Sequence, residues 1–378
     1  MIYLDHAAAT PLDPAVLNAM QPYLSDRFYN PSATYLPAQE VRAVLNEARG
    51  RVAHWLGARP TEVIFTAGGT EANNLAIQGV LRKFPNCSVL VSSIEHDSVL
   101  KTAEKFNCSV ALVTEQGRVE LEKLRAQITD EPVLVSIMYA NNEVGTIQPI
   151  RDVADIVREI RENRRKAGNV TPLYLHTDAC QAVNYLDLQA ARLGVDMMTL
   201  NGGKIYGPKQ SGILYVASYV ELEPLIYGGG QERGLRSGTE NVAGAVGFAA
   251  ALNAAQSIRK EETYRLSELQ HYAYKQILEK LRSVVVNGDT KHRLPNNLHI
   301  TLPGTDNERV LLQLESAGIL TAAGSACSAS SDTPSHVLRA MGIADKDARS
   351  SLRITMGRST TQQDIDALVK ALETIVAT

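Results

Sequence analysis

The chain has 378 residues, of which 44% are hydrophobic and 21% are charged, an ordinary composition for a soluble globular protein. A net charge of −3 gives no basic field, so we expect no direct nucleic-acid partner. No apolar run is long enough to span a membrane, and strand-like residues directly follow Met1 without room for a secretory leader. We therefore expect a cytoplasmic protein with no membrane partner, built as one large domain and a smaller companion.

The first two thirds of the chain alternate between helical and strand-like patterns. Helical spacing is expected at 13–24, at 36–56, in a segment that ends at Phe84, at 119–128 and at 150–160. A long helical region is expected at 241–282. Apolar runs predict buried strands that start at Val63 or lie at 88–92, 110–113, 133–138, 173–175 and 195–200. This alternation predicts an α/β fold with a mainly parallel sheet covered by helices on both faces.

The C-terminal third predicts a smaller α+β domain. Strands are expected near 284–286, 298–302 and 352–355, with helices at 306–317, 334–341 and 361–376. Thr361 and Asp364 have the spacing of a capping box at the start of the last helix. We place the large domain at 13–255 and form the small domain from 1–12 together with 256–378.

Lys204 lies in a glycine-rich turn that follows the apolar run 195–200. Gly202 and Gly203 allow the backbone to come close to a ligand. A poorly hydrated lysine at such a strand end can act as a nucleophile or form a Schiff base. Taken alone, a surface lysine in a hairpin loop is the simpler interpretation of a Gly-Lys pair.

A second glycine-rich turn, Gly68-Gly69-Thr70, joins the strand at Val63 to the helix that ends near 84. Free N–H groups and the positive end of the helix dipole would meet there, which predicts an anion site suited to phosphate. In isolation, a plain N-cap by Thr70 is the simpler interpretation and the one to prefer.

Polar residues follow the predicted strands repeatedly. In a mainly parallel sheet, ligands bind at the carboxyl ends of the strands, where these residues would meet. Each one alone could be a satisfied turn residue. The polar groups at successive strand ends are Gly69 with Thr70, His96, Asn142, Asp178 with Gln181, and Lys204.

The four cysteines are Cys87, Cys108, Cys180 and Cys327. They are widely spaced and form no Cys-x-x-Cys pair, which indicates neither a disulfide framework nor a zinc site. Burial as a small apolar side chain is the common fate of such residues. The run 322–334 is small and polar, however, so we expect Cys327 to be an exposed, reactive thiol on a mobile loop.

Together these stretches resemble the cysteine desulfurases of the NifS/IscS type, in the class-V aminotransferase family. The resemblance runs from Tyr3-Leu-Asp-His6 to the stretch 351–358, and so covers essentially the whole chain. Its most specific parts are Lys204-Ile-Tyr-Gly-Pro-Lys209, the stretch 232–241 and Gly324-Ser-Ala-Cys-Ser328. It implies the aspartate-aminotransferase-like fold type I of enzymes that depend on pyridoxal 5'-phosphate.

The resemblance implies that Lys204 holds pyridoxal phosphate covalently. Asp178 would pair with the pyridinium nitrogen and keep the ring an electron sink. His96 would stack on the ring and could act as a general acid. The other cofactor contacts that the family implies surround the ring and its phosphate: Gly69, Thr70, Asn142, Gln181, Asn201 and, from the neighbouring subunit of a homodimer, Thr239.

For the substrate, L-cysteine, the family implies that Arg353 and Asn30 hold the carboxylate. The Cys327 thiolate would take the sulfur as a persulfide while alanine leaves. The sulfur would pass to an iron–sulfur scaffold protein or to a carrier for tRNA thiolation. No metal is expected to be intrinsic, although Cys327 could ligate a transient iron–sulfur cluster shared with the scaffold.

Two positions depart from the usual family pattern. Gly203 stands where the family usually has a histidine, and Asn201 stands where it has a serine that helps to bind the phosphate. Asn201 can replace the serine as a donor, whereas Gly203 cannot replace an imidazole. Two other functions therefore stay open beside cysteine desulfuration. One is a selenocysteine lyase, and the other is a weakly active cofactor-binding scaffold for sulfur-transfer partners.

Overall fold

The computed structural model describes residues 1–281, 283–324 and 333–377. Within these ranges, the largest sheet has seven strands in the order β2-β8-β7-β6-β5-β3-β4. Strands β7, β6, β5, β3 and β4 run parallel, while β8 is antiparallel to both β2 and β7. The predicted mainly parallel sheet is thus confirmed. The strands are β2 (Val63–Thr66), β3 (Ser88–Ser92), β4 (Cys108–Ala111), β5 (Pro132–Ser136), β6 (Tyr174–Asp178), β7 (Met197–Asn201) and β8 (Gly212–Val216).

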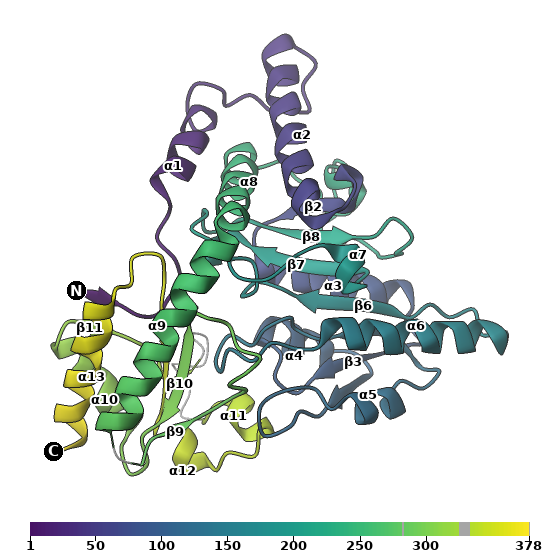
Figure 1. Cartoon of the computed structure of the whole chain (residues 1–378). Helices are drawn as coiled ribbons and strands as arrows, with labels where there is room; N and C mark the ends of the chain where they lie inside the picture. The colour runs from purple at the N-terminus through teal and green to yellow at the C-terminus, as the bar shows by residue number, and fades with distance from the viewer. Residues whose placement is uncertain (282, 325–332, 378) are drawn as a thin grey trace.

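Both faces of this sheet are buried, and the two-residue period of a strand decides which face a side chain joins. Leu134 and Met197 pack in the cluster with helices α3 and α4, whereas Val135 and Met198 pack in the cluster with α5, α6 and α7. Helices therefore cover the sheet on both sides (Figure 1). Their bounds are α3 (Gly69–Lys83), α4 (Asp97–Ala103), α5 (Leu121–Gln127), α6 (Ile150–Lys166) and α7 (Ala190–Leu193).

Three further helices pack at the β2 side of the sheet. α8 (Val242–Ser257) packs against both α1 (Pro14–Met20) and α2 (Leu36–Leu56), which projects furthest from the sheet (Figure 1). α2 ends at Gly57, whose φ of 62° is the left-handed conformation that glycine adopts most readily after a helix.

The C-terminal third forms its own hydrophobic cluster, to which Leu4 from the N-terminal segment also belongs. β10 (Asn297–Thr301) lies between β12 (Ser351–Thr355) and β9 (Val285–Val286), and β1 (Ile2–Tyr3) pairs with β11 (Ile319–Leu320). The predicted capping box of Thr361 and Asp364 is confirmed. The domain boundary near residue 255 stays a prediction. The helices here are α9 (Arg259–Lys280), α10 (Asn307–Ser316), α11 (His336–Ala340), α12 (Asp345–Ala348) and α13 (Gln362–Val376).

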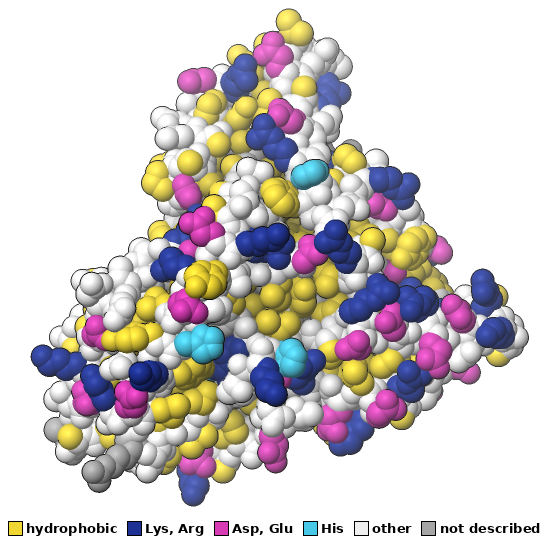
Figure 2. All heavy atoms as spheres, viewed as in Figure 1, with side chains coloured by type: hydrophobic (Ala, Val, Ile, Leu, Met, Phe, Trp, Pro, Cys, Tyr) yellow, Lys and Arg dark blue, Asp and Glu magenta, His cyan; other side chains and the backbone are white. Residues whose placement is uncertain are grey.

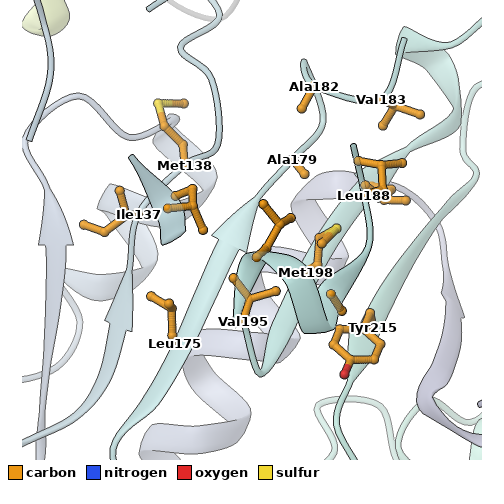
Figure 3. Close-up of a cluster of buried hydrophobic side chains, with 14 of the residues drawn as sticks. Ile137, Met138, Leu175, Ala179, Ala182, Val183, Leu188, Val195, Met198 and Tyr215 are labelled. Carbon is orange, nitrogen blue, oxygen red and sulfur yellow. The ribbon is translucent and has the colours of Figure 1, made fainter. Parts of the chain in front are cut away.

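The apolar cluster on the α6 side also supports the carboxyl ends of the central strands. Figure 3 shows Ile137, Leu175, Ala179 and Met198 gathered in this cluster, all of them buried. Ala179 directly follows Asp178, the last residue of β6. Packing of Ala179 therefore anchors the turn that presents Asp178 above the sheet.

The surface carries charges of both signs. On the face shown in Figure 2, Lys and Arg side chains are interspersed with Asp and Glu, as a net charge of −3 would suggest. Among the helices within the described ranges, we find none with the length and apolar character needed to cross a membrane.

Candidate active site

A cavity opens at the carboxyl ends of the central strands, where small-molecule sites form in sheets of this kind. The structure brings most of the predicted site residues together in its lining: Gly69, Thr70, His96, Asn142, Asp178, Gln181, Asn201, Lys204 and Arg353. Their convergence in one cavity matches the sequence-based expectation.

Lys204 ends a short 3-10 turn, η3 (Gly202–Lys204), directly after β7. Its half-buried amine donates hydrogen bonds to the carbonyl oxygens of Ala7 at 2.9 Å and Ala8 at 2.5 Å. Because β7 and β8 are antiparallel, Lys204 does lie in a hairpin connection, as the simpler interpretation supposed. Its side chain nevertheless enters the cavity rather than the open surface.

The start of α3 supplies an anion-binding arrangement beside Lys204. Gly68 is the N-cap and offers no side-chain cap, so the alternative assignment of Thr70 as the N-cap is wrong. The first-turn N–H groups therefore lack a capping side chain. The amide oxygen of Asn201 accepts a hydrogen bond from the Gly203 N–H at 3.0 Å, while its amide nitrogen lies near Gly69.

Asp178 also lines the cavity and is buried. Its two carboxylate oxygens each accept one hydrogen bond, from Asn73 Nδ2 at 2.7 Å and from the Cys180 backbone N–H at 2.9 Å. These two donors fix the plane of the carboxylate. Burial raises the pKa of the neighbouring Cys180 thiol well above its ordinary value, so this thiol stays protonated at neutral pH.

His96 follows β3 and caps the N-terminus of α4. Its Nδ1 accepts a hydrogen bond from the Ser98 backbone N–H at 3.0 Å and lies 2.8 Å from the Ser98 hydroxyl. The preceding Glu95 is fully buried, and burial raises the pKa of its carboxyl group to about 8. Glu95 Oε1 accepts hydrogen bonds from the Ser92 hydroxyl at 2.5 Å and from the Met138 N–H at 2.7 Å.

Arg353 on β12 brings a buried guanidinium to the cavity. It pairs with Asp5 at 2.7 Å and donates to the Asn142 carbonyl oxygen at 3.2 Å. Its Nε is buried and has no hydrogen-bond partner in the described part of the chain. A buried donor of this kind needs a partner, and a carboxylate is the group that a guanidinium binds best.

Three predicted site residues are not part of this lining. Asn30 is exposed, and its side chain accepts a hydrogen bond from the Ser32 N–H at 2.9 Å. Thr239 is also exposed and lines a separate hollow together with Arg236. Cys327 lies outside the described residues.

Sequence reasoning assigned no role to several residues that the structure places at or beside the cavity. Asp5, Asn73 and Ser98 act through hydrogen bonds to predicted site residues. Asn73 belongs to the glycine-rich strand–turn–helix stretch and Asp5 to the N-terminal motif, but their partners lie far away in sequence. Only the packing of the strands and helices brings them together.

The side chains present fit pyridoxal phosphate. The cavity combines a primary amine, uncapped N–H groups at a helix start, and a buried carboxylate. These groups match an aldehyde, a phosphate and a basic ring nitrogen respectively. The Arg353 guanidinium, which also lines the cavity, suits the carboxylate of an amino acid.

Comparisons with known proteins agree with this assignment. The family model for class-V aminotransferases matches residues 2–368. A protein named cysteine desulfurase IscS from Dictyoglomus turgidum is 38% identical over 99% of this chain and 94% of its own length. The structure superposes on a NifS-like protein with a TM-score of 0.91 and 31% identity, covering 100% of this chain and 99% of the other.

Another solved structure, SspA in complex with cysteine, has a TM-score of 0.81 and 33% identity, covering 94% of this chain and 99% of its own. The agreement extends over whole chains and includes the strand ends that form the cavity. The chain therefore belongs to the class-V aminotransferase family and, within it, to the cysteine desulfurases of the NifS/IscS type.

Proposed function

We propose that the Lys204 cavity removes the sulfur of L-cysteine, releasing L-alanine and leaving a persulfide on Cys327. The observation that carries the proposal is the convergence of an amine, a buried carboxylate and a buried guanidinium in one cavity. The family is pyridoxal-phosphate-dependent, and its relative SspA has been solved with cysteine.

In this proposal each side chain has a definite task. Lys204 holds the cofactor and later moves a proton at the Cα of the substrate. Arg353 binds the substrate carboxylate, and His96 packs on the ring and supplies a proton as alanine forms. When bound, pyridoxal phosphate supplies an electron sink that stabilises negative charge at the substrate Cα, with Asp178 beside its ring nitrogen.

Further residues would hold the cofactor in place. Gly69, Thr70 and Asn201 would bind the phosphate, as the helix start and the Asn201 amide suggest. Asn142 and Gln181 would contact the oxygen side of the ring, and both line the cavity.

In the sulfur-transfer step, one bond of the substrate sulfur breaks and one bond to the Cys327 sulfur forms. The C–S bond of the substrate breaks, and an S–S bond forms to the thiolate of Cys327. The electron pair of the broken bond stays with the substrate carbon. That carbon is then protonated, and the product leaves as alanine. We expect the persulfide sulfur to pass on to an iron–sulfur scaffold protein or a sulfur carrier.

A homodimer would complete the site. Thr239 is exposed and lies outside the Lys204 cavity of its own chain, so Thr239 of one subunit can bind the phosphate in the other. Sedimentation in solution should give twice the chain mass of 41.1 kDa. A monomer with full activity would contradict this arrangement. A cytoplasmic location stays a prediction.

The test is to mix the purified holoprotein with L-cysteine and measure alanine, persulfide and visible absorbance. Wild type should form alanine, whereas Cys327→Ala should keep its colour and change its spectrum with cysteine but form no alanine. Cys87→Ala is the matched control, because Cys87 lies outside the cavity, and it should behave as wild type. Alanine formation by Cys327→Ala at the normal rate would overturn the role of this thiol.

A further inference from the structure

One buried amide contacts both Asp178 and Ser98, which line the cavity. Asn73, in the first turns of α3, has only 1% of its surface exposed. Its Nδ2 lies 2.7 Å from Asp178 Oδ2 and 2.8 Å from Ser98 Oγ. An ionised carboxylate only accepts hydrogen bonds, so the contact with Asp178 fixes which amide atom is the nitrogen.

The amide therefore donates both of its hydrogens, one to each neighbour. Asn73 Oδ1 is buried and has no hydrogen-bond partner among residues 1–281, 283–324 and 333–377. No competing contact in that part of the chain turns the amide the other way. Its orientation is set by Asp178 and Ser98 alone.

Ser98 passes this orientation on to His96. Because Ser98 Oγ accepts from Asn73, its own hydrogen is available to His96 Nδ1, which lies 2.8 Å away. The Ser98 backbone N–H also donates to the same nitrogen at 3.0 Å. Nδ1 is thus an acceptor, and a neutral ring must carry its proton on Nε2.

We propose that Asn73 is a positioning residue that, through Ser98, holds Asp178 and His96 in a fixed relation across the cofactor ring. The inference rests on the proposed function, which puts Asp178 at the ring nitrogen and His96 on the ring face. Helices α3 and α4 pack together, so the relay spans an existing contact between two rigid elements. Asn73 also lines the cavity, but in this scheme it acts through Asp178 and Ser98.

A double-mutant cycle tests the relay in the full-length holoprotein. Asn73→Ala should lower kcat about tenfold with little change in KM, the size of effect common for residues that orient functional groups. The visible circular dichroism of bound pyridoxal phosphate should change in shape, because that signal reports the orientation of the ring. Ser98→Ala should have a smaller effect of the same kind.

The coupling between the two variants gives the decisive result. If the relay is continuous, the Asn73→Ala/Ser98→Ala protein should be no worse than Asn73→Ala alone. Effects that simply multiply would overturn the relay, and so would an unchanged kcat and dichroism in Asn73→Ala. Gln78→Ala is the matched control on the same helix, since Gln78 contacts Asn74 and Arg82 and lies outside the cavity lining, and it should match wild type.

An isosteric change separates orientation from packing. Asn73→Asp keeps the shape but replaces a donor by a carboxylate beside Asp178, so it should lose more activity than Asn73→Ala. A purely structural role for Asn73 predicts the reverse order. Thermal melting would show whether Asn73→Ala folds. If it does not fold, Asn73→Asp and Ser98→Ala still test the proposal.

A readout independent of turnover is the tautomer of His96, seen by ¹⁵N NMR of the full-length, histidine-labelled protein. Wild type should carry its ring proton on Nε2, and a proton on Nδ1 would overturn the assigned contacts. If the proposed function itself failed, wild type would form no alanine from L-cysteine. Failure of the relay alone would leave alanine formation by wild type intact and make the Asn73 variants indistinguishable from wild type.

Discussion

The two ends of the cavity are built in different ways. On the Asp178 side, which comprises Asn73, His96, Ser98 and Asp178, each side chain hydrogen-bonds to the next. On the Lys204 side, which comprises Gly69, Thr70, Asn201, Gly203 and Lys204, glycines and backbone N–H groups predominate, and there is room to spare at Gly203. A methyl group built at Gly203 would meet only ordinary contacts, the nearest being Asn201 Oδ1 at 3.5 Å.

The difference follows from what each side has to do. Electrostatic and proton-transfer roles depend on orientation, so the Asp178 side needs fixed partners. In the proposed function, a covalent bond to Lys204 and a helix N-terminus at the phosphate would hold the cofactor without a dense side-chain network. Asn201 and Gly203, which depart from the family pattern, both lie on the Lys204 side.

The largest effect is expected from Asp178→Asn, which removes the charge and keeps the shape. The Asp178 side should tolerate this poorly, and kcat should fall by about 10²–10³, as for other removals of a preorganised electrostatic group. Asp187→Asn is a suitable control, because Asp187 pairs with Arg192 outside the cavity. Steady-state kinetics with L-cysteine would measure the loss of kcat. A loss of less than threefold would contradict the view that the Asp178 side depends on fixed electrostatic groups.

The next largest effect concerns the carboxylate site. Arg353→Lys keeps the charge but loses the planar fork and the unpartnered Nε, so KM for L-cysteine should rise about 10–100-fold. We expect a smaller change in kcat. Arg358→Lys serves as the control, since Arg358 pairs with Asp13 and lies outside the lining. An unchanged KM in Arg353→Lys would exclude this guanidinium as the carboxylate ligand.

Two adjacent glycines test how much room the Lys204 side has. A Cβ at Gly202 would collide with the Ser211 hydroxyl and lie 3.0 Å from the Pro208 carbonyl oxygen, so Gly202→Ala should cost about 1–3 kcal/mol. Gly203→Ala should change the free energy of unfolding by less than about 0.5 kcal/mol. Urea unfolding of both cofactor-free variants measures this, and equal losses would mean that the Lys204 side is as tightly packed as the other.

The smallest effect is a pH dependence that arises at Glu95. Burial raises the pKa of its carboxyl group to about 8 in the folded protein, against an ordinary value of 4.5. Between these pH values the unfolded chain loses the proton and the folded chain keeps it, so wild-type stability should fall as pH rises from about 5 to 8.

Glu95→Gln removes this titration. The variant should therefore gain more than about 1 kcal/mol relative to wild type at pH 8 compared with pH 5. Urea unfolding at the two pH values measures the difference, with the exposed Glu104→Gln as a control that should keep the wild-type slope. A parallel loss in wild type and Glu95→Gln would show that Glu95 is ionised in the folded state.

Much of the architecture could be predicted because it depends on local pattern. Apolar runs marked the five parallel strands, and the polar residues after them marked the cavity, since parallel strands end at the same edge. The antiparallel strand β8 was not predicted, because Gly212–Val216 follows a turn whose hairpin pairing only the tertiary structure fixes. The long helical region at 241–282 proved to be two helices, which Ile258 separates.

The relay on the Asp178 side could not be predicted for a similar reason. Asn73 and Asp178 lie 105 positions apart, and their contact depends on how α3 packs on the sheet. Arg353 and Asp5 are 348 positions apart and meet only because the N-terminal segment runs alongside β12. Asn30, in contrast, was assigned from its motif alone, and its backbone position leaves it outside the lining.

The central claim is that the amine of Lys204 is the covalent anchor of pyridoxal phosphate in this cavity. The most direct measurement is borohydride reduction of the holoprotein, followed by proteolysis and mass spectrometry to locate the pyridoxyl group. We predict a single adduct on Lys204, and no visible band, adduct or alanine in Lys204→Ala. An adduct on another lysine, or undiminished cysteine cleavage by Lys204→Ala, would contradict the account.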